Sequence, residues 1–211
     1  MKWLLQKDWG KNMKRIFDVK IAVNVFLICL LSLLMVSVDS AFSKKIAGVD
    51  VPQSVTIENK ALVLNGAGIR KKYFFKIYVG ALYLSVKRTT VNAIINDAGA
   101  KRIVMSFLYK ELSTEDLVDG WNEGFAGNNS AKEMKSLQDR INKFNSLFTT
   151  VRKGDEIQLD YLPGEGTQVR LNGVLKGSVP GEDFSRAVLK IWLGSKPADA
   201  NLKDAMLGNS Y

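Results

Sequence analysis

The stretch from Ala61 to Val86, ALVLNGAGIRKKYFFKIYVGALYLSV, is rich in aromatic and β-branched residues and contains no proline. This composition suits a pleated surface that is buried on at least one side. Asn-Gly-Ala-Gly at 65–68 interrupts it, and glycines allow the positive φ that a tight connection between strands needs. We therefore predict a short strand at 61–64, a tight turn at 65–68, and a longer central strand that carries Arg70 and Tyr78.

Hydrophobic periodicity predicts the elements on either side of this stretch. An extended lead-in is expected at 48–52. Other strands are expected at 54–58, 101–109, 156–162, 166–171 and 174–178. Helices are expected at 91–98, between Ser113 and Gly127, at 131–148, between Pro180 and Gly194, and at 199–207. This uneven alternation predicts an α+β fold, in which a mainly antiparallel open sheet is covered on one face by a layer of helices.

The composition excludes several kinds of chemistry. The chain contains no histidine, which rules out Ser-His triads, His-Cys dyads and histidine-based metal sites. Its one cysteine, Cys29, lies in an apolar run near the N-terminus, so a processed product would contain none. The net charge is +9, but lysines and arginines are scattered among acids rather than gathered with aromatics in a stripe. We expect no metal, no cofactor and no nucleic-acid partner.

The N-terminal residues differ in composition from the rest. Residues 1–20 hold six lysines or arginines, residues 21–38 carry no charge, and small residues follow up to Ala41. This layout is typical of a secretory signal, although an uncharged run of this length also reaches the lower limit of a membrane span. We expect residues 1–41 to be a signal peptide or N-terminal anchor and 42–211 to form one domain. The product would be periplasmic or secreted, or alternatively anchored in the membrane by residues 21–38.

Three segments carry a family resemblance: NGAGIRKKYFFKIYVGALYL, LNGVLKGSVPGEDFSRAVLKIWLGSKP and NLKDAMLG. Together they resemble the chalcone isomerase-like family, in particular its bacterial secreted branch, over roughly residues 51–208. The resemblance implies an open sheet covered by helices, with a ligand cleft between the two layers. The family includes isomerases that close a chalcone to a flavanone and non-catalytic members that bind fatty acids.

Two residues match the functional positions of the family. Arg70 falls on the family's arginine, which grips the anionic oxygen of the ligand in the enzymes and the carboxylate in the fatty-acid binders. Tyr78 falls where the plant enzymes have a threonine, and the fatty-acid binders share this tyrosine. The resemblance thus implies that both residues bind ligand.

Other positions depart from the enzymes. Their water-holding tyrosine falls at or near Thr114, their helix lysine near Leu117, and their substrate-contacting asparagine near Trp121 or Asn122. A further polar residue of the cleft falls near Ile191. Cyclisation needs a positioned polar network around the attacking phenolate. Apolar residues at several of these places imply an apolar cleft with one cationic end. Thr114 and Trp121 would contribute to this cleft as ligand-binding residues.

The residues alone support an anionic ligand for Arg70. A half-buried arginine needs an anionic partner, and its planar fork matches a carboxylate. The nearest acid in sequence, Glu58, is expected on another strand; the alternatives are pairing with a distant acid such as Asp160, or solvation. On one regular strand Arg70 and Tyr78 would share a face but lie about 26 Å apart, so joint contact requires the chain to bend or reverse near Lys71-Lys72.

Three hypotheses follow. The leading one is an exported protein that binds a small acidic apolar ligand, a fatty acid, without robust catalysis. The second is an intramolecular lyase or isomerase of chalcone isomerase type acting on a phenolic or carbonyl compound, with Arg70 stabilising an oxyanion and Tyr78 holding a water or proton. The third is a structural envelope protein with a vestigial cleft.

Overall fold

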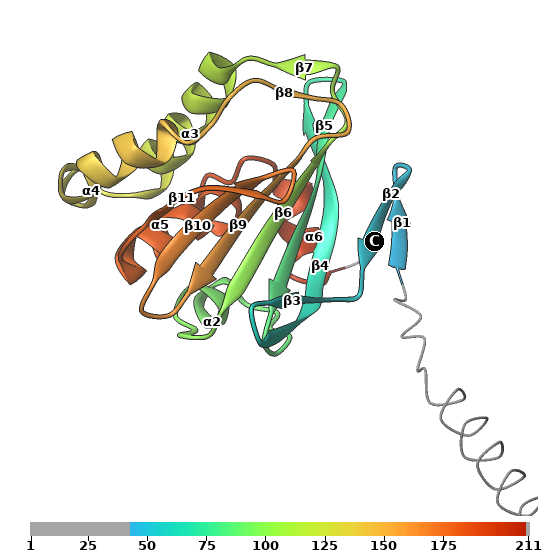
Figure 1. Cartoon of the computed structure of the whole chain (residues 1–211), viewed down its shortest axis with the longest axis horizontal. Helices are drawn as coiled ribbons and strands as arrows, with labels where there is room; N and C mark the ends of the chain where they lie inside the picture. Colours follow the sequence, from blue (N-terminus) through green and yellow to red (C-terminus); the bar gives the residue numbers. More distant parts are fainter. Residues whose placement is uncertain (1–42, 210–211) are drawn as a thin grey trace, which may run out of the picture. The chain divides into compact units, whose positions relative to one another are not determined.

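The computed structural model describes residues 43–209 (Figure 1). The expected signal peptide or anchor lies outside these residues. Within them, no helix combines the length and apolar character that crossing a membrane requires. The strands are β1 (Ser43–Ile46), β2 (Val49–Pro52), β3 (Ser54–Ile57), β4 (Lys60–Lys72), β5 (Phe75–Leu84), β6 (Lys101–Phe107), β7 (Glu111–Leu112), β8 (Val151–Arg152), β9 (Glu156–Leu162), β10 (Gly166–Leu171) and β11 (Val174–Val179). The helices are α2 (Val91–Ile95), α3 (Thr114–Asn128), α4 (Ala131–Asn145), α5 (Glu182–Leu193) and α6 (Ala200–Met206).

The main sheet of the described residues has seven strands in the order β11-β10-β9-β6-β5-β4-β3. Every neighbouring pair in it is antiparallel. Figure 1 shows α3, α4 and α5 on one side of this sheet. The predicted fold class, an α+β fold with a mainly antiparallel sheet and a helical layer on one face, is confirmed.

The predicted tight turn at 65–68 is wrong. Strand β4 runs without reversal from Lys60 to Lys72 and contains this segment, with an irregularity in its pairing to β5 between Leu64 and Gly66. The chain reverses at Tyr73 and Phe74, since Lys72 pairs directly with Phe75. The central element is therefore a long β4–β5 hairpin.

The glycines of β4 serve the close approach of helix α6. A Cβ atom at Gly66 would overlap the carbonyl oxygen of Ala205, and one at Gly68 would lie 2.7 Å from the Ala205 Cβ. On β5, a Cβ at Gly80 would lie 2.9 Å from the Met206 Cε. These three glycines, Gly66, Gly68 and Gly80, form a shallow track that we call the glycine track. Neither Gly66 nor Gly68 has a positive φ, so close packing rather than turn geometry explains them.

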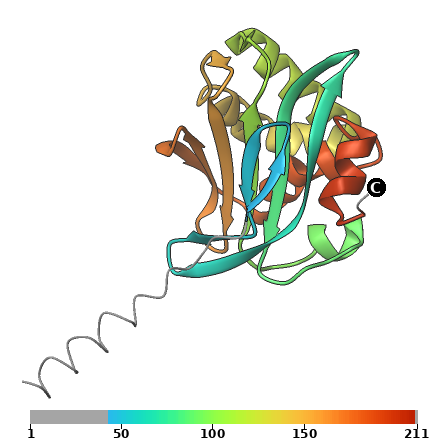
Figure 2. The same ribbon diagram turned by 90° about the vertical axis from the view of Figure 1, so that its right-hand side faces the viewer.

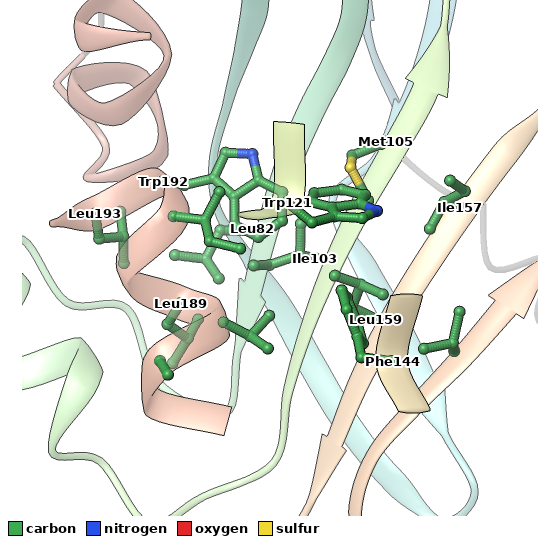
Figure 3. Close-up of a cluster of buried hydrophobic side chains, with 14 of the residues drawn as sticks. Leu82, Ile103, Met105, Trp121, Phe144, Ile157, Leu159, Leu189, Trp192 and Leu193 are labelled. Atoms are coloured by element: carbon green, nitrogen blue, oxygen red, sulfur yellow. The ribbon is translucent and has the colours of Figure 1, made fainter. Parts of the chain in front are cut away.

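The main core lies between the sheet and the helices (Figure 3). The apolar residues spaced three or four positions apart in α3 and α5 are buried, namely Leu117, Trp121, Phe125, Phe184, Val188, Leu189 and Trp192. Figure 3 shows Trp121 and Trp192 among aliphatic side chains from the sheet and from α5. The periodicity of the sequence therefore identified the buried face of each helix correctly.

The opposite face of the sheet is partly covered by the β1–β2 hairpin, which the sequence did not reveal (Figure 2). Val51 belongs to a second buried cluster on this face, with Ile46 and Val49 packed against it. The Tyr83 hydroxyl donates a hydrogen bond of 3.0 Å to the carbonyl oxygen of Pro52. Only an extended lead-in was expected at 48–52, because strands of four residues leave little periodicity to detect.

Candidate functional site

A cavity of about 250 Å³ lies between the sheet and the helical layer. Its sheet wall comes from the β4–β5 hairpin and β6, and includes Arg70, Tyr78 and Phe107. Its opposite wall comes from α3 and α5 and includes Trp121 and Ile191. The cavity occupies the place predicted for a ligand cleft.

Arg70 and Tyr78 face each other across the hairpin. They are directly paired in the β4–β5 register, which places both side chains on one face of the sheet. The Arg70 Cζ lies 5.5 Å from the centroid of the Tyr78 ring. The reversal that their joint contact required does occur, at Tyr73 and Phe74, immediately after Lys71-Lys72.

Arg70 has no carboxylate partner among residues 43–209. Asp160, the distant acid considered as an alternative, is bound instead by Arg102 at 2.6 Å and lies 3.7 Å from Arg170. The Arg70 Nε is buried and makes no hydrogen bond to any residue of 43–209. Pairing with Asp160 is therefore wrong, which leaves a bound anion or solvent as the partner of the guanidinium.

Asp199 is the acid next to this region, and backbone groups occupy both of its oxygens. Its Oδ2 accepts a hydrogen bond of 2.8 Å from the Lys71 amide. Its Oδ1 accepts one of 3.0 Å from the Leu202 amide, which caps α6. Asp199 thus fixes the end of β4 to α6, and it forms no ion pair with Arg70 in the described part of the chain.

Tyr78 is a hydrogen-bond donor at the cavity wall. The Trp192 Nε1–H donates to its hydroxyl oxygen at 2.8 Å, and the hydroxyl hydrogen has no acceptor in the described part of the chain. Burial raises the pKa of Tyr78, and the positive charge of Arg70 opposes that rise without cancelling it. The phenol therefore stays protonated at neutral pH and can donate to a ligand oxygen. Trp192, a core residue of α5 that sequence analysis did not place at the site, positions this hydroxyl.

Trp121 contributes an aromatic ring to the wall of the cavity. Its indole Nε1 is buried and has no hydrogen-bond partner among the described residues. Its ring lies 5.8 Å from that of Trp192 and 5.3 Å from that of Phe148, so packing holds it in place. Leu117 and Ile191, which stand near polar positions of the related enzymes, also line the cavity.

Thr114 is the one predicted ligand-binding residue that does not line the cavity. It is the first residue of α3, and its hydroxyl lies 3.5 Å from that of Thr150. Its neighbours Leu112, Asp116 and Leu117 do reach the cavity. A contact between Thr114 and a ligand stays a prediction.

Charged groups lie on both walls of the cavity. Arg70 and Lys72 line it from β4, while Glu111, Asp116 and Glu123 line it from β7 and α3. Glu111 is paired with Arg152 at 2.8 Å. Within residues 43–209, no three acidic, cysteine or histidine side chains are grouped to hold a metal ion. The arrangement can hold an anionic head group against the hairpin and an apolar tail against the aromatic and aliphatic lining.

A family model described as chalcone isomerase-like matches residues 43–208. The chain belongs to the chalcone isomerase-like family. A search of curated proteins gave no match. Among solved structures, a fatty-acid-binding protein from Arabidopsis thaliana has a similar fold, with a TM-score of 0.60 and 18% sequence identity. The match covers 80% of this chain and 96% of the Arabidopsis chain. The Arg70–Tyr78 pair of this chalcone isomerase-like protein thus lies in a fold shared with a fatty-acid-binding protein.

Proposed function

We propose that this chalcone isomerase-like protein binds a small apolar carboxylate, a fatty acid, and does not catalyse robust ring closure. One observation carries the proposal: Arg70, Tyr78 and Trp121 line one cavity, and each has a donor group without an acceptor among the described residues. Buried donors are normally paired, because an unsatisfied one costs about 1–3 kcal/mol. A ligand oxygen placed between Arg70 and Tyr78, which face each other across the hairpin, would accept hydrogen bonds from both.

A carboxylate fits these donors better than a neutral group does. The guanidinium of Arg70 can bind two carboxylate oxygens with two parallel hydrogen bonds, and such charge-assisted bonds are about twice as strong as neutral ones. The protonated Tyr78 can donate to the same head group, since both side chains stand opposite each other in the hairpin. The alkyl chain would lie against Phe107, Leu117 and Ile191, where each buried methylene is worth about 0.8 kcal/mol. The fold shared with a fatty-acid-binding protein is consistent with this proposal.

The lining also argues against an isomerase. Tyr78 has a raised pKa, which makes it a poor base at neutral pH. Leu117 and Ile191, which stand at cavity positions where the resemblance implies polar residues in the enzymes, offer no group that could hold a water or accept a proton. Ring closure needs such polar groups positioned around the attacking phenolate, in addition to an arginine that stabilises its charge.

The proposed setting is outside the cytoplasm. The basic residues at 1–20, the uncharged run at 21–38 and the small residues that follow support export, with cleavage near Ala41 or retention as an anchor. A fatty-acid binder in that setting would carry its ligand between membranes or from the medium. This assignment rests on the sequence of the N-terminal segment.

Titration calorimetry with dodecanoate tests whether Arg70 and Tyr78 bind the carboxylate of the ligand. Arg70→Ala is expected to weaken binding by about 1.5–3 kcal/mol, roughly tenfold to 150-fold, because one charge-assisted contact is lost. Tyr78→Phe is expected to cost less, about 0.5–1.5 kcal/mol, because only a neutral hydrogen bond disappears. Arg186→Ala is the matched control, since Arg186 pairs with Glu182 on α5 and does not line the cavity. Dodecanol should bind the wild type more weakly than dodecanoate and should respond little to Arg70→Ala.

Unchanged dodecanoate affinity in both variants, with the fold intact by circular dichroism, would exclude carboxylate binding by Arg70 and Tyr78. A parallel assay of chalcone ring closure separates the alternative function. We expect rates close to the uncatalysed reaction. Efficient turnover that is lost in Arg70→Ala would instead identify an isomerase.

A further inference from the structure

The tip of the β4–β5 hairpin exposes three consecutive aromatic residues. Tyr73, Phe74 and Phe75 are 86%, 98% and 56% exposed. The other large hydrophobic residues exposed within 43–209 are aliphatic and lie singly or as one pair. A run of three exposed aromatics is unfavourable in water, and an exposed apolar patch of this kind marks a contact surface.

The tip keeps a bulky residue where a smaller one would be less strained. Tyr73 occupies the first position of the two-residue turn with φ of 55°, a conformation in which glycine, asparagine or aspartate is preferred. The ring of Phe75 packs edge-on against Tyr109, with the centroids 5.5 Å apart, which holds the tip against the body of the domain. Strain of this kind persists where a side chain has a role that outweighs its conformational cost.

Three lysines flank the aromatics: Lys71, Lys72 and Lys76, all exposed. None of them forms an ion pair with the described residues. The sequence KKYFFK thus places three unpaired lysines around the three exposed aromatic residues. This combination matches the interface of an anionic lipid bilayer, where aromatic rings lie at head-group depth and lysines contact lipid phosphates.

We propose that the hairpin tip, residues 71–76, docks on the surface of an anionic lipid bilayer. Tyr73 and Phe75 enter the interface together with Phe74, and the three lysines bind the head groups. Lys72, Tyr73 and Phe75 also line the cavity, so the docked tip brings this part of the cavity lining to the membrane. An apolar ligand can then pass between bilayer and cavity without crossing water. Docking itself does not depend on the identity of that ligand.

The test uses the full chain with Cys29→Ser, so that an environment-sensitive fluorophore can be attached at one introduced cysteine. Phe74→Cys places the fluorophore at the tip. Val174→Cys is the matched control, because Val174 is a 59% exposed apolar residue that begins β11, just after the β10–β11 turn. Each protein is mixed, without added fatty acid, with vesicles of phosphatidylglycerol and phosphatidylcholine or of phosphatidylcholine alone. Because the signal is local, attachment through the N-terminal segment does not imitate tip insertion.

The expected result is a blue shift of the Phe74→Cys fluorophore with the anionic vesicles, a much smaller shift with neutral vesicles, and none at the control site. Combining Lys71→Gln, Lys72→Gln and Lys76→Gln should abolish most of the shift, as should high salt. A tip fluorophore that stays in a water-like environment with anionic vesicles would overturn the proposal. So would equal shifts at both sites, or a shift without vesicles that grows with protein concentration, which would identify a second copy as the occupant.

Discussion

Replacing Gly66 by alanine should separate helix α6 from the sheet. An added Cβ would overlap the carbonyl oxygen of Ala205, which is a backbone atom and cannot move away by changing a rotamer. Ordinary overpacking costs about 1–3 kcal/mol. If α6 lifts from the sheet instead, the burial of Leu202 and Met206 is lost, at about 1.5–3 kcal/mol for each side chain. The expected destabilisation is therefore about 3–6 kcal/mol.

Gly127→Ala is the control, because it makes the same chemical change with the opposite expected sign. Gly127 lies within α3, and an added Cβ would meet only the Lys196 side chain, at 3.7 Å. Alanine should stabilise this helix by about 0.5–1 kcal/mol, which corresponds to a rise in Tm of about 1–4 °C. Urea denaturation followed by circular dichroism measures both variants, and amide hydrogen exchange shows whether α6 opens alone. If Gly66→Ala were as stable as the wild type, with α6 equally protected, the close-packing role of the glycine track would be refuted.

Two further predictions concern pH and processing. Glu133 accepts hydrogen bonds from the Ser130 backbone and hydroxyl and from Lys190, and these lower its pKa from 4.5 to about 2. Its contribution to stability is therefore complete above pH 4.5 and lost as pH falls toward 2, so the urea midpoint of Glu133→Gln should fall less over this window than that of the wild type. Intact mass of the exported protein should show a chain that begins near residue 42; a full-length, membrane-bound chain would contradict cleavage.

Local patterns determined most of the element boundaries. Strands β9 and β10 have the predicted limits, because alternation in 156–162 and 166–171 is closed by turn residues on both sides. Helix starts were equally clear: α2 and α3 begin where the sequence predicts, directly after Thr90 and Ser113, whose hydroxyls accept hydrogen bonds from the first turn. These signals need only neighbours in sequence, which explains why they were sufficient.

The predictions were wrong where the role of a residue depends on contact with an element that is distant in the sequence. Gly66 and Gly68 were interpreted as a turn, but glycine is needed at these positions because α6, more than 130 residues later in the chain, packs closely against them. The real turn at Tyr73-Phe74 contains none of the residues that usually signal one, so nothing in the sequence marked it. Moving the turn from 65–68 to 73–74 also changed the expected distance between Arg70 and Tyr78, which became directly opposed residues.

The candidate site was predicted unevenly for a related reason. The family resemblance placed Arg70, Tyr78 and Trp121 at ligand positions, and the structure brings all three to one cavity. Thr114 was placed there by the same correspondence, yet it lies outside the lining at the start of α3. The bond from Trp192 to Tyr78 could not be inferred at all, because it joins residues 114 positions apart.

The glycine track and the candidate site are connected through Asp199. Because Gly66, Gly68 and Gly80 carry no side chains, α6 lies close enough for its capping residue to bind the Lys71 amide at 2.8 Å. That bond fixes the backbone next to Arg70, and the same carboxylate, held by two amides, forms no ion pair with the guanidinium among the described residues. A substitution that lifts α6 would free both the end of β4 and an acid beside the cavity. Loss of close packing at the track should therefore weaken anion binding as well as stability, although none of its glycines lines the cavity.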